Sequence, residues 1–300
     1  MIKKKFATPL VTVCIPSYNH GKYINQAMDS VVQQTYTNLE IIVVDSYSTD
    51  KTDEVLERFN DPRIKVLKNR NYGSIALSRN LAVTNSNGEW IAFLDSDDWW
   101  TLDKINKCSR YFRENIDLIY HNLIIINENE KIIKNKIVKS RKLKNPVLKD
   151  LLIKGNTIGT SSVIVRKSIL MKVEGMNESK EMHGVEDFNT WLKISQVSDS
   201  FKLVSKNLGF YRVHERNFSH DRKFQMPTAA FMEFSQLLTT KELTAMYGNY
   251  EFANVRRNFL SNNFASIQKD LIKLTRKGRL SNRVKAIYML LIVSLKIITK

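Results

Sequence analysis

The 300-residue sequence contains only two cysteines, Cys14 in an apolar run and Cys108 in a predicted helix. So few cysteines exclude a disulfide framework and indicate a reducing compartment. The basic residues within positions 1–10 are not followed by the continuous apolar segment of a signal peptide. We therefore expect a cytoplasmic protein.

Acidic residues are scarce relative to basic ones, and the formal net charge is +17 at pH 7. Residues 131–149 carry eight Lys or Arg and no acid, and residues 256–300 carry eleven against one acid, Asp270. Such blocks indicate an anionic partner, for which nucleic acid, anionic lipid and a phosphorylated substrate are the candidates, beside plain solubility charge. Because zinc-ligand spacings, recognition-helix signatures and RNP-like aromatic motifs are missing, we expect no nucleic-acid partner.

Apolar residues make up 43% of the chain, which is ample for a sizeable core. Over the first hundred residues, short apolar runs alternate with amphipathic stretches, a pattern typical of successive βα units and a mostly parallel sheet. We expect strands at residues 10–15, 39–44, 64–67, 90–94, 118–127, 131–138, 161–165 and 203–213. We expect helices at residues 23–34, 53–59, 74–83, 104–112, 168–173 and 188–195, and a helical texture from residue 221 onward.

Three carboxylates, Asp95, Asp97 and Asp98, follow the apolar run 90–94 at once. The carboxyl ends of parallel strands face the crevice in which open α/β sheets bind ligands. Crowded carboxylates need a counter-charge, and a hard divalent cation with phosphate oxygens is one candidate. Taken alone, the cluster is explained as well or better by a solvated acidic turn that caps the next helix.

Polar residues also follow the first two predicted strands, at Pro16 to Asn19 and at Asp45 to Asp50. With these neighbours, the sequence resembles the inverting glycosyltransferases of family 2. The resemblance covers most of residues 8–220 in family order, through the stretches VTVCIPSYNHGKYINQAMDSVVQQTYTNLEIIVVDSYSTDKT, NYGSIALSRNLAVTNSNGEWIAFLDSDDWW, TSSVIVRKSILMKVEGMN, GVEDFNTWLKIS and YRVHERNFS. Several motifs in order are far harder to obtain by chance than one.

The resemblance implies a GT-A fold, an α/β architecture with a Rossmann-like, mostly parallel mixed sheet flanked by helices. It implies a transferase domain over residues 1–220, with a nucleotide-sugar half to about residue 120 and an acceptor half over 121–220. A basic helical extension would occupy residues 221–300. The donor would be a nucleotide-diphosphate sugar, the cofactor Mn²⁺ or Mg²⁺, and the acceptor a glycan or lipid-linked glycan of surface polysaccharide synthesis.

Site residues for the donor follow from the same resemblance. Asp45 would hydrogen-bond the base or ribose, and Tyr18 would lie near the nucleobase. Ser46 stands where the family more often has a second Asp that reads uracil, so a UDP-sugar is expected while dTDP and GDP donors stay open. Asp97 and Asp98 would hold the metal. The residues implied for the donor are Pro16, Tyr18, Asn19, Asp45, Ser46, Arg79, Asp95, Ser96, Asp97, Arg212 and His214.

Glu186 and Asp187 match the Glu-Asp pair of the family, in which the aspartate is the general base. Without that context, two acids before a helix would simply satisfy the helix dipole. Glu186, His183 and Ser161 are implied for the acceptor. Arg212 and His214 resemble late basic residues that grip the diphosphate, so a mobile loop over residues 212–222 is expected. No role is expected for the remaining histidines, His20, His121 and His220.

Two other functions stay open. A sugar-nucleotide pyrophosphorylase would share the strand-helix alternation, but it should carry a Gly-rich basic loop after the first strand, where residues 16–21 read PSYNHG. A non-catalytic glycan or membrane adaptor could use the same fold. Detectable donor hydrolysis with manganese would argue against the adaptor.

The carboxyl-terminal segment 276–300 has ten uninterrupted apolar or weakly polar residues at 286–295, too few to span a bilayer. Basic residues beside such a run are typical of a helix that lies on an anionic membrane surface, here the inner face of the cell membrane. A helix docked on its own domain or on another subunit is the alternative, and the oligomeric state stays open. If the membrane interpretation holds, deleting residues 276–300 should abolish flotation with liposomes.

Overall fold

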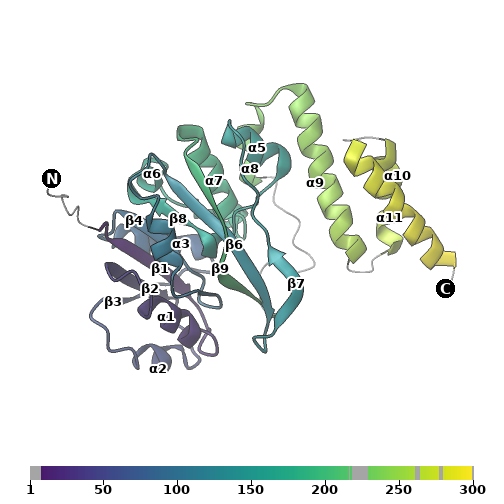
Figure 1. The fold of residues 1–300 in the computed structure, drawn as a ribbon. Coiled ribbons are helices and arrows are strands. Elements are labelled where there is room, and N and C mark those ends of the chain that lie inside the picture. Colours follow the sequence, from purple (N-terminus) through teal and green to yellow (C-terminus); the bar gives the residue numbers. More distant parts are fainter. Residues whose placement is uncertain (1–7, 216, 218–228, 261–263, 277–279, 299–300) are drawn as a thin grey trace. The chain divides into compact units, whose positions relative to one another are not determined.

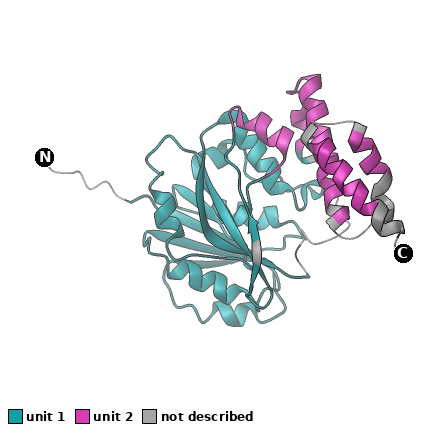
Figure 2. Cartoon of the chain, turned by 45° about the vertical axis from the view of Figure 1, so that its right-hand side comes forward, with its two compact units in different colours: residues 1–143, 157–230 teal, residues 144–156, 231–300 magenta. Residues whose placement is uncertain are grey.

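The structure, a computed structural model, describes residues 8–215, 217, 229–260, 264–276 and 280–298. The chain divides into two compact units, one of residues 1–143 and 157–230 and the other of residues 144–156 and 231–300 (Figure 2). The helical unit thus includes the segment 144–156, which lies far from it in the sequence. The sequence indicates only that a mainly helical pattern begins near residue 220.

The first unit is built on a mixed sheet that has nine strands in the described part of the chain, ordered β3-β2-β1-β4-β8-β6-β9-β5, with β7 paired to β6 (Figure 1). β1 to β4 are parallel, whereas β8 runs antiparallel to both β4 and β6. The long strands β6 and β9 lie side by side and are parallel. The strands are β1 (Val11–Ser17), β2 (Leu39–Asp45), β3 (Ile64–Lys68), β4 (Trp90–Phe93), β5 (Trp99–Trp100), β6 (Leu118–Asn127), β7 (Ile132–Val138), β8 (Ile164–Arg166) and β9 (Phe201–Val213).

The central strands read as almost continuous apolar runs because both of their faces are covered. Every residue of β1 and β4 is buried, and in β2 every residue except the partly exposed Glu40 is buried. Such runs are typical of parallel strands with packed layers on both sides, where polar side chains would lose their hydration. The prediction of an α/β sheet is therefore confirmed: its first four strands are parallel, and the antiparallel pairings of the later strands make the whole sheet mixed.

All six helices predicted before residue 221 are present, although three are shorter than expected. The helices are α1 (Ile24–Val32), α2 (Thr52–Leu56), α3 (Ile75–Thr84), α4 (Lys104–Ser109), α5 (Val147–Lys154), α6 (Lys167–Lys172), α7 (Glu186–Val197), α8 (Ala229–Ser235), α9 (Thr240–Leu260), α10 (Phe264–Arg276) and α11 (Leu280–Ile298). Two elements, β5 and α5, were not predicted, because a two-residue strand and a short helix show little periodicity. Residues 161–163, predicted as strand, lie in and just after a 3₁₀ turn (Thr160–Ser162) that precedes β8.

The second unit packs its long helices around a core of its own. The buried members of this core are Val255, Leu271, Leu274, Ala286, Met289 and Val293, from α9, α10 and α11. α5 joins the unit through ion pairing of Lys149 with Glu242 at 3.0 Å. None of the helices within the described residues is both long and apolar enough to cross a bilayer.

Lys104 is an unusual member of the first unit's interior. It is fully buried, its Nζ lies 3.4 Å from the centroid of the Trp100 ring, and it has no hydrogen-bond partner among the described residues. Burial lowers the pKa of Lys104 to about 7. A cation in this place weakens the fold, because an ammonium loses its hydration there and gains no anion.

We expect Lys104→Met to raise the free energy of unfolding by ~1–4 kcal/mol at pH 7, since the apolar stem is kept and the charge is lost. The unfolded lysine holds its proton up to about pH 10.5. The wild-type protein therefore gains stability as the pH rises from about 7 toward 10.5, and the variant lacks this gain. Urea denaturation across this range measures both effects. Lys107→Met, which removes a surface pair with Asp103, should change little, and equal curves for Lys104→Met and wild type would contradict the expectation.

Candidate active site

The loops after β1, β2 and β4 begin at one edge of the sheet. In the parallel register Ser17 pairs with Asp45, and Cys14 pairs with Phe93. Asn19 ties the first two loops together, because its backbone N–H donates to Ser48 Oγ at 2.8 Å and its Oδ1 accepts from the Thr49 N–H at 2.8 Å. The expected convergence of polar strand ends is therefore present.

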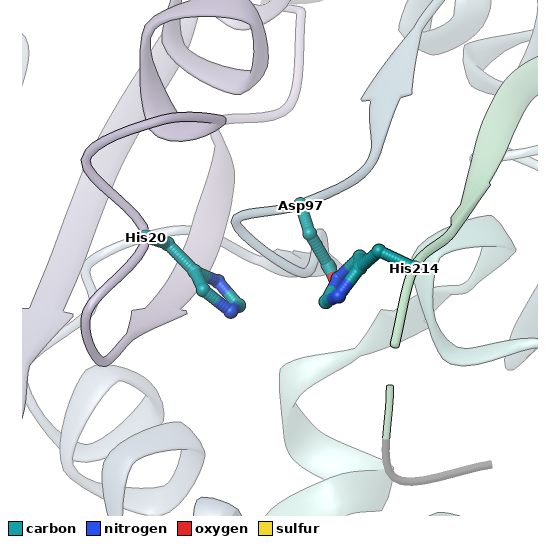
Figure 3. A group of neighbouring side chains, drawn as sticks. All are labelled: His20, Asp97 and His214. Carbon is teal, nitrogen blue, oxygen red and sulfur yellow. The ribbon is translucent and has the colours of Figure 1, made fainter. Parts of the chain in front are cut away.

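A group of three side chains, His20, Asp97 and His214, meets at this edge (Figure 3). His20 comes from the loop after β1, Asp97 from the loop after β4, and His214 from the residue that follows β9. His214 Nε2 lies 2.9 Å from Asp97 Oδ2. Although burial opposes it, the hydrogen bond from His214 and the nearby His20 keep the pKa of Asp97 below its usual value.

These three residues suit a divalent cation. One potential ligand atom from each lies within 4.8 Å of the others, a spread compatible with ligands around a single ion. His20 Nδ1 lies 2.7 Å from Ser96 Oγ, which orients the imidazole as outer hydrogen bonds orient metal-bound histidines. Two imidazoles beside one carboxylate favour Mn²⁺ over Mg²⁺, because Mg²⁺ prefers oxygen ligands.

Arg212 holds the backbone of the acidic loop, residues 95–98, which follows β4. It is 2% exposed, and its Nε donates to the carbonyl of Asp97 at 3.0 Å. The guanidinium carbon lies 4.8 Å from the centroid of the Tyr23 ring and 4.9 Å from that of the Trp99 ring. Its terminal nitrogens donate to Gln26 and to the Glu128 carbonyl. Arg212 therefore positions Asp97 in this structure, while the predicted grip on a diphosphate stays a prediction.

Asp98 is turned away from the histidines. It is 2% exposed, its Oδ1 accepts from the backbone N–H of Arg212 at 3.0 Å, and it is not a member of the three-residue group. Burial and the neighbouring Asp97 and Asp95 raise the pKa of Asp98 well above its usual value. Asp98 therefore has a different environment from Asp97, and its predicted role as a cation ligand stays a prediction.

Arg79 connects the acidic loop to the start of α7. It is 3% exposed, with Nη2 at 2.6 Å from Asp95 Oδ1 and Nη1 at 2.8 Å from Glu186 Oε1. These paired contacts fix the loop that carries Asp95 and the Glu186-Asp187 pair relative to each other. Both terminal nitrogens are engaged by carboxylates, so the predicted contact of Arg79 with the nucleotide stays a prediction.

Asp187 stands at the first turn of α7 with its carboxylate held from both sides. Oδ2 accepts from Thr160 Oγ1 at 2.9 Å, and Oδ1 accepts from the Phe188 N–H at 2.6 Å. Burial and the neighbouring Glu186 raise the pKa of Asp187 to about 6, although Arg79 opposes the shift. Near neutral pH this group is mostly ionised yet basic enough to accept a proton, as a general base requires.

The family model described as Glycosyl transferase family 2 matches residues 12–173, more than half of the chain. The protein belongs to glycosyltransferase family 2. Two Escherichia coli relatives are WfgD, 33% identical over 218 residues, and WfaP, 31% identical over 216 residues. Each alignment covers 71% of this chain and 81% of the relative. Both are named as UDP-Glc:alpha-D-GlcNAc-diphosphoundecaprenol beta-1,3-glucosyltransferases.

Solved structures agree on the fold. Staphylococcus aureus TarS 1-349 in complex with UDP-GlcNAc superposes with a TM-score of 0.64 at 19% identity, covering 95% of this chain and 90% of that one. The mannosyltransferase PcManGT from Pyrobaculum calidifontis, in complex with GDP-Man and Mn²⁺, gives a TM-score of 0.55 at 16% identity, covering 97% and 87%. The predicted GT-A fold with helices at the carboxyl end is thereby confirmed, and the chain is a glycosyltransferase.

The residues predicted to bind the donor differ in how exposed their side chains are. Tyr18 is 57% exposed at the loop after β1, where a nucleobase could stack on it. The buried carboxylate of Asp45 accepts from Lys68 Nζ at 2.9 Å and from Ser48. The Ser46 hydroxyl contacts Asn69 Oδ1 at 3.2 Å and Ser78 Oγ at 3.3 Å. Pro16 is buried within β1 and shapes the loop without offering a donor.

Among the residues predicted to bind the acceptor, Ser161 is 2% exposed and supports the loop after β4, because its Oγ accepts from the Asp95 N–H at 3.1 Å. The ring of His183 lies beside Gly73, at the edge of the loop that leads into α3. Their predicted contacts with the acceptor stay predictions. The predicted mobile loop over residues 212–222 lies largely outside the described residues, which include 212–215 and 217.

Two residues at the site were missed from the sequence. His20 was given no role, yet it lies beside Asp97 and His214. Asn217 Nδ2 donates to Asp97 Oδ2 at 3.3 Å and to the Arg212 carbonyl at 3.1 Å. The position of His20, three residues after β1 and at the same sheet edge as Asp97, was an available signal.

Proposed function

We propose that the protein is an inverting, metal-dependent transferase that moves a sugar from a UDP-sugar to a hydroxyl group of a glycan or lipid-linked acceptor. The observation that carries this proposal is Asp187, a carboxylate whose pKa is raised to about 6 and whose neighbour Glu186 is joined through Arg79 to the acidic loop. A basic carboxylate beside a nucleotide site is what direct displacement by a hydroxyl group needs.

In the proposed reaction the acceptor oxygen attacks the anomeric carbon from the face opposite the nucleotide. The bond from that carbon to the diphosphate oxygen breaks, its electron pair stays with the nucleoside diphosphate, and the acceptor proton passes to Asp187. Inversion of the anomeric centre follows. Thr160 orients the receiving carboxylate by its 2.9 Å hydrogen bond to Oδ2.

Support for a UDP donor and a lipid-linked acceptor comes from the relatives, since WfgD and WfaP are both named for UDP-Glc and for a diphosphoundecaprenol acceptor. Ser46, with its hydroxyl group, can both donate to and accept from a nucleobase. A thermal-shift screen of UDP-, dTDP- and GDP-sugars with Mn²⁺ tests the donor, because a tight ligand stabilises the fold by mass action. Stabilisation by a GDP-sugar alone would contradict the assignment.

We propose that His20, Asp97 and His214 hold the cation. A divalent cation bound there would neutralise charge on the departing diphosphate. His20 and His214 would each offer the lone pair of an unprotonated ring nitrogen to the cation.

We expect His20→Ala to weaken binding of Mn²⁺ about tenfold or more, because one of three protein ligands is lost. Titration of Mn²⁺ into the protein, followed by electron paramagnetic resonance of the free ion, measures the affinity without turnover. His183→Gln serves as the matched control, since this histidine lies outside the group of three, and its affinity should equal that of wild type. Equal affinities for wild type and His20→Ala would remove His20 from the site.

Donor hydrolysis also separates the enzyme from a non-catalytic adaptor that uses the same fold. Slow release of UDP from a UDP-sugar in the presence of Mn²⁺, without acceptor, is expected of the transferase. Tight nucleotide binding without release or transfer would favour the adaptor.

A further inference from the structure

α11 presents a second apolar face, opposite to the one that packs in the helical unit. Its buried residues Ala286, Met289 and Val293 belong to the core of that unit. The opposite side carries four large exposed apolar residues, Val284, Ile287, Tyr288 and Leu291, which are 58%, 48%, 66% and 59% exposed. Their spacing of three, four and seven residues places them in one stripe along the helix.

This stripe, residues 284, 287, 288 and 291, needs an explanation because exposed apolar side chains normally occur singly. Four in a row on one helix form a contiguous patch, which marks an interaction site. The opposite face already supplies the packing of the unit, so the stripe is not required for the fold of α11.

Two basic side chains border the stripe. Arg283 and Lys285 are both exposed, and at 100° per residue they fall on opposite sides of it. The sequence from residue 276 to residue 300 contains seven Lys or Arg and no Asp or Glu. The partner of this face must therefore accept apolar side chains in its centre and positive charge along both sides.

We propose that α11 docks this stripe on the surface of an anionic phospholipid bilayer. Apolar side chains would enter the boundary between headgroups and acyl chains, while Arg283 and Lys285 reach the lipid phosphates. Tyr288 suits the same depth, because its ring is apolar and its hydroxyl group can stay hydrated. A second copy of the helix fits less well, since pairing two such stripes would bring their basic borders together.

The test uses the full-length protein and flotation with vesicles of phosphatidylcholine, with or without phosphatidylglycerol, and with no sugar acceptor. We expect wild type to float with the anionic vesicles. Ile287→Ser combined with Leu291→Ser should lower the partition coefficient at least tenfold, because both side chains lose apolar area that the bilayer would cover. The matched control is Met171→Ser with Val197→Ser, two exposed apolar residues of the first unit, which should float like wild type.

A second variant probes charge instead of apolar area. Arg283→Gln with Lys285→Gln should weaken binding to the anionic vesicles about fivefold for each charge and leave weak binding to phosphatidylcholine unchanged. Circular dichroism melts verify that each variant is folded. Failure of wild type to float, or equal flotation of wild type and Ile287→Ser/Leu291→Ser, would overturn the proposal. A different result would also overturn it: light scattering shows that wild type is a dimer and that Ile287→Ser/Leu291→Ser is a monomer, and wild type does not bind the vesicles. Because no donor or acceptor is present, these outcomes are independent of the proposed transfer reaction.

Discussion

Replacing Asp187 by Asn is expected to reduce sugar transfer by a factor on the order of a thousand or more while donor binding stays nearly intact. The amide keeps the size of the carboxylate and can still accept the hydrogen bond from the Phe188 N–H. It cannot take the acceptor proton. Initial rates with a UDP-sugar and acceptor measure the loss, and calorimetry with UDP measures binding.

If Asp187 served only to stabilise the fold, Asp187→Asn would lower the melting temperature and leave turnover normal. The pKa of Asp187 is about 6 in the folded protein, above the usual value of 3.8. Ionisation of Asp187 therefore lowers the free energy of unfolding as the pH rises above about 4, and the full loss is present above about pH 6. Asp187→Asn should therefore melt at the same temperature as wild type or higher at pH 7. Normal turnover by this variant would remove Asp187 as the base.

The pH profile gives an independent test of the same group. The rate of transfer should rise as the pH increases through about 6, because the base must be ionised in the free enzyme. Thr160→Val removes a hydrogen bond that lowers the pKa of Asp187, so it should shift this limb of the profile to higher pH. An unshifted limb in that variant would indicate that another group titrates.

Replacing Asp97 by Asn should weaken the Mn²⁺-dependent binding of UDP a hundredfold or more, on the order of 3 kcal/mol, because the negatively charged ligand of the proposed cation site is lost. Calorimetry with UDP in the presence and absence of Mn²⁺ measures this effect. Binding without the cation should be nearly unchanged, which separates loss of the cation from loss of the fold.

Asp98→Asn is the matched control for Asp97→Asn. Its amide can keep the hydrogen bond that Asp98 Oδ1 accepts from the Arg212 N–H, and burial with the neighbouring Asp97 and Asp95 raises the pKa of Asp98 well above its usual value. We expect this variant to bind Mn²⁺ and UDP nearly as wild type does. Equal losses in the two variants would make Asp98 a cation ligand, as the family resemblance implied.

Much of the fold could be predicted because the strands β1, β2 and β4 are buried on both faces. Burial of this kind forces apolar composition, and apolar runs are visible in a sequence without knowledge of contacts. β5 and α5 escaped prediction because their formation depends on distant partners. β5 exists through pairing of Trp99 with Phe210.

The positions of several predicted site residues follow from strand order alone, while their roles stay predictions. Residues that end parallel strands must lie at one sheet edge, so Asn19, Asp45 and Asp97 could be grouped from the sequence. Strand order does not say which way a side chain points: Asp97 faces the histidines, whereas Asp98 is buried against the backbone of Arg212, and its role as a cation ligand stays a prediction. Adjacent residues in a turn can point in opposite directions, and only the packing around them selects which one faces the ligand.

The sequence by itself determined the family, the α/β sheet and the convergence of polar loops at the carboxyl ends of its strands, because these depend on local composition and on motifs in order. The tertiary structure decided which side chains meet: His20 and His214 with Asp97, Arg79 between Asp95 and Glu186, and the outward stripe on α11. The paired residues are far apart in the sequence, by 194 positions for His20 and His214. The stripe on α11 depends instead on which face of the helix is already buried. Local propensity carries no information on such contacts, whereas close packing in three dimensions fixes them.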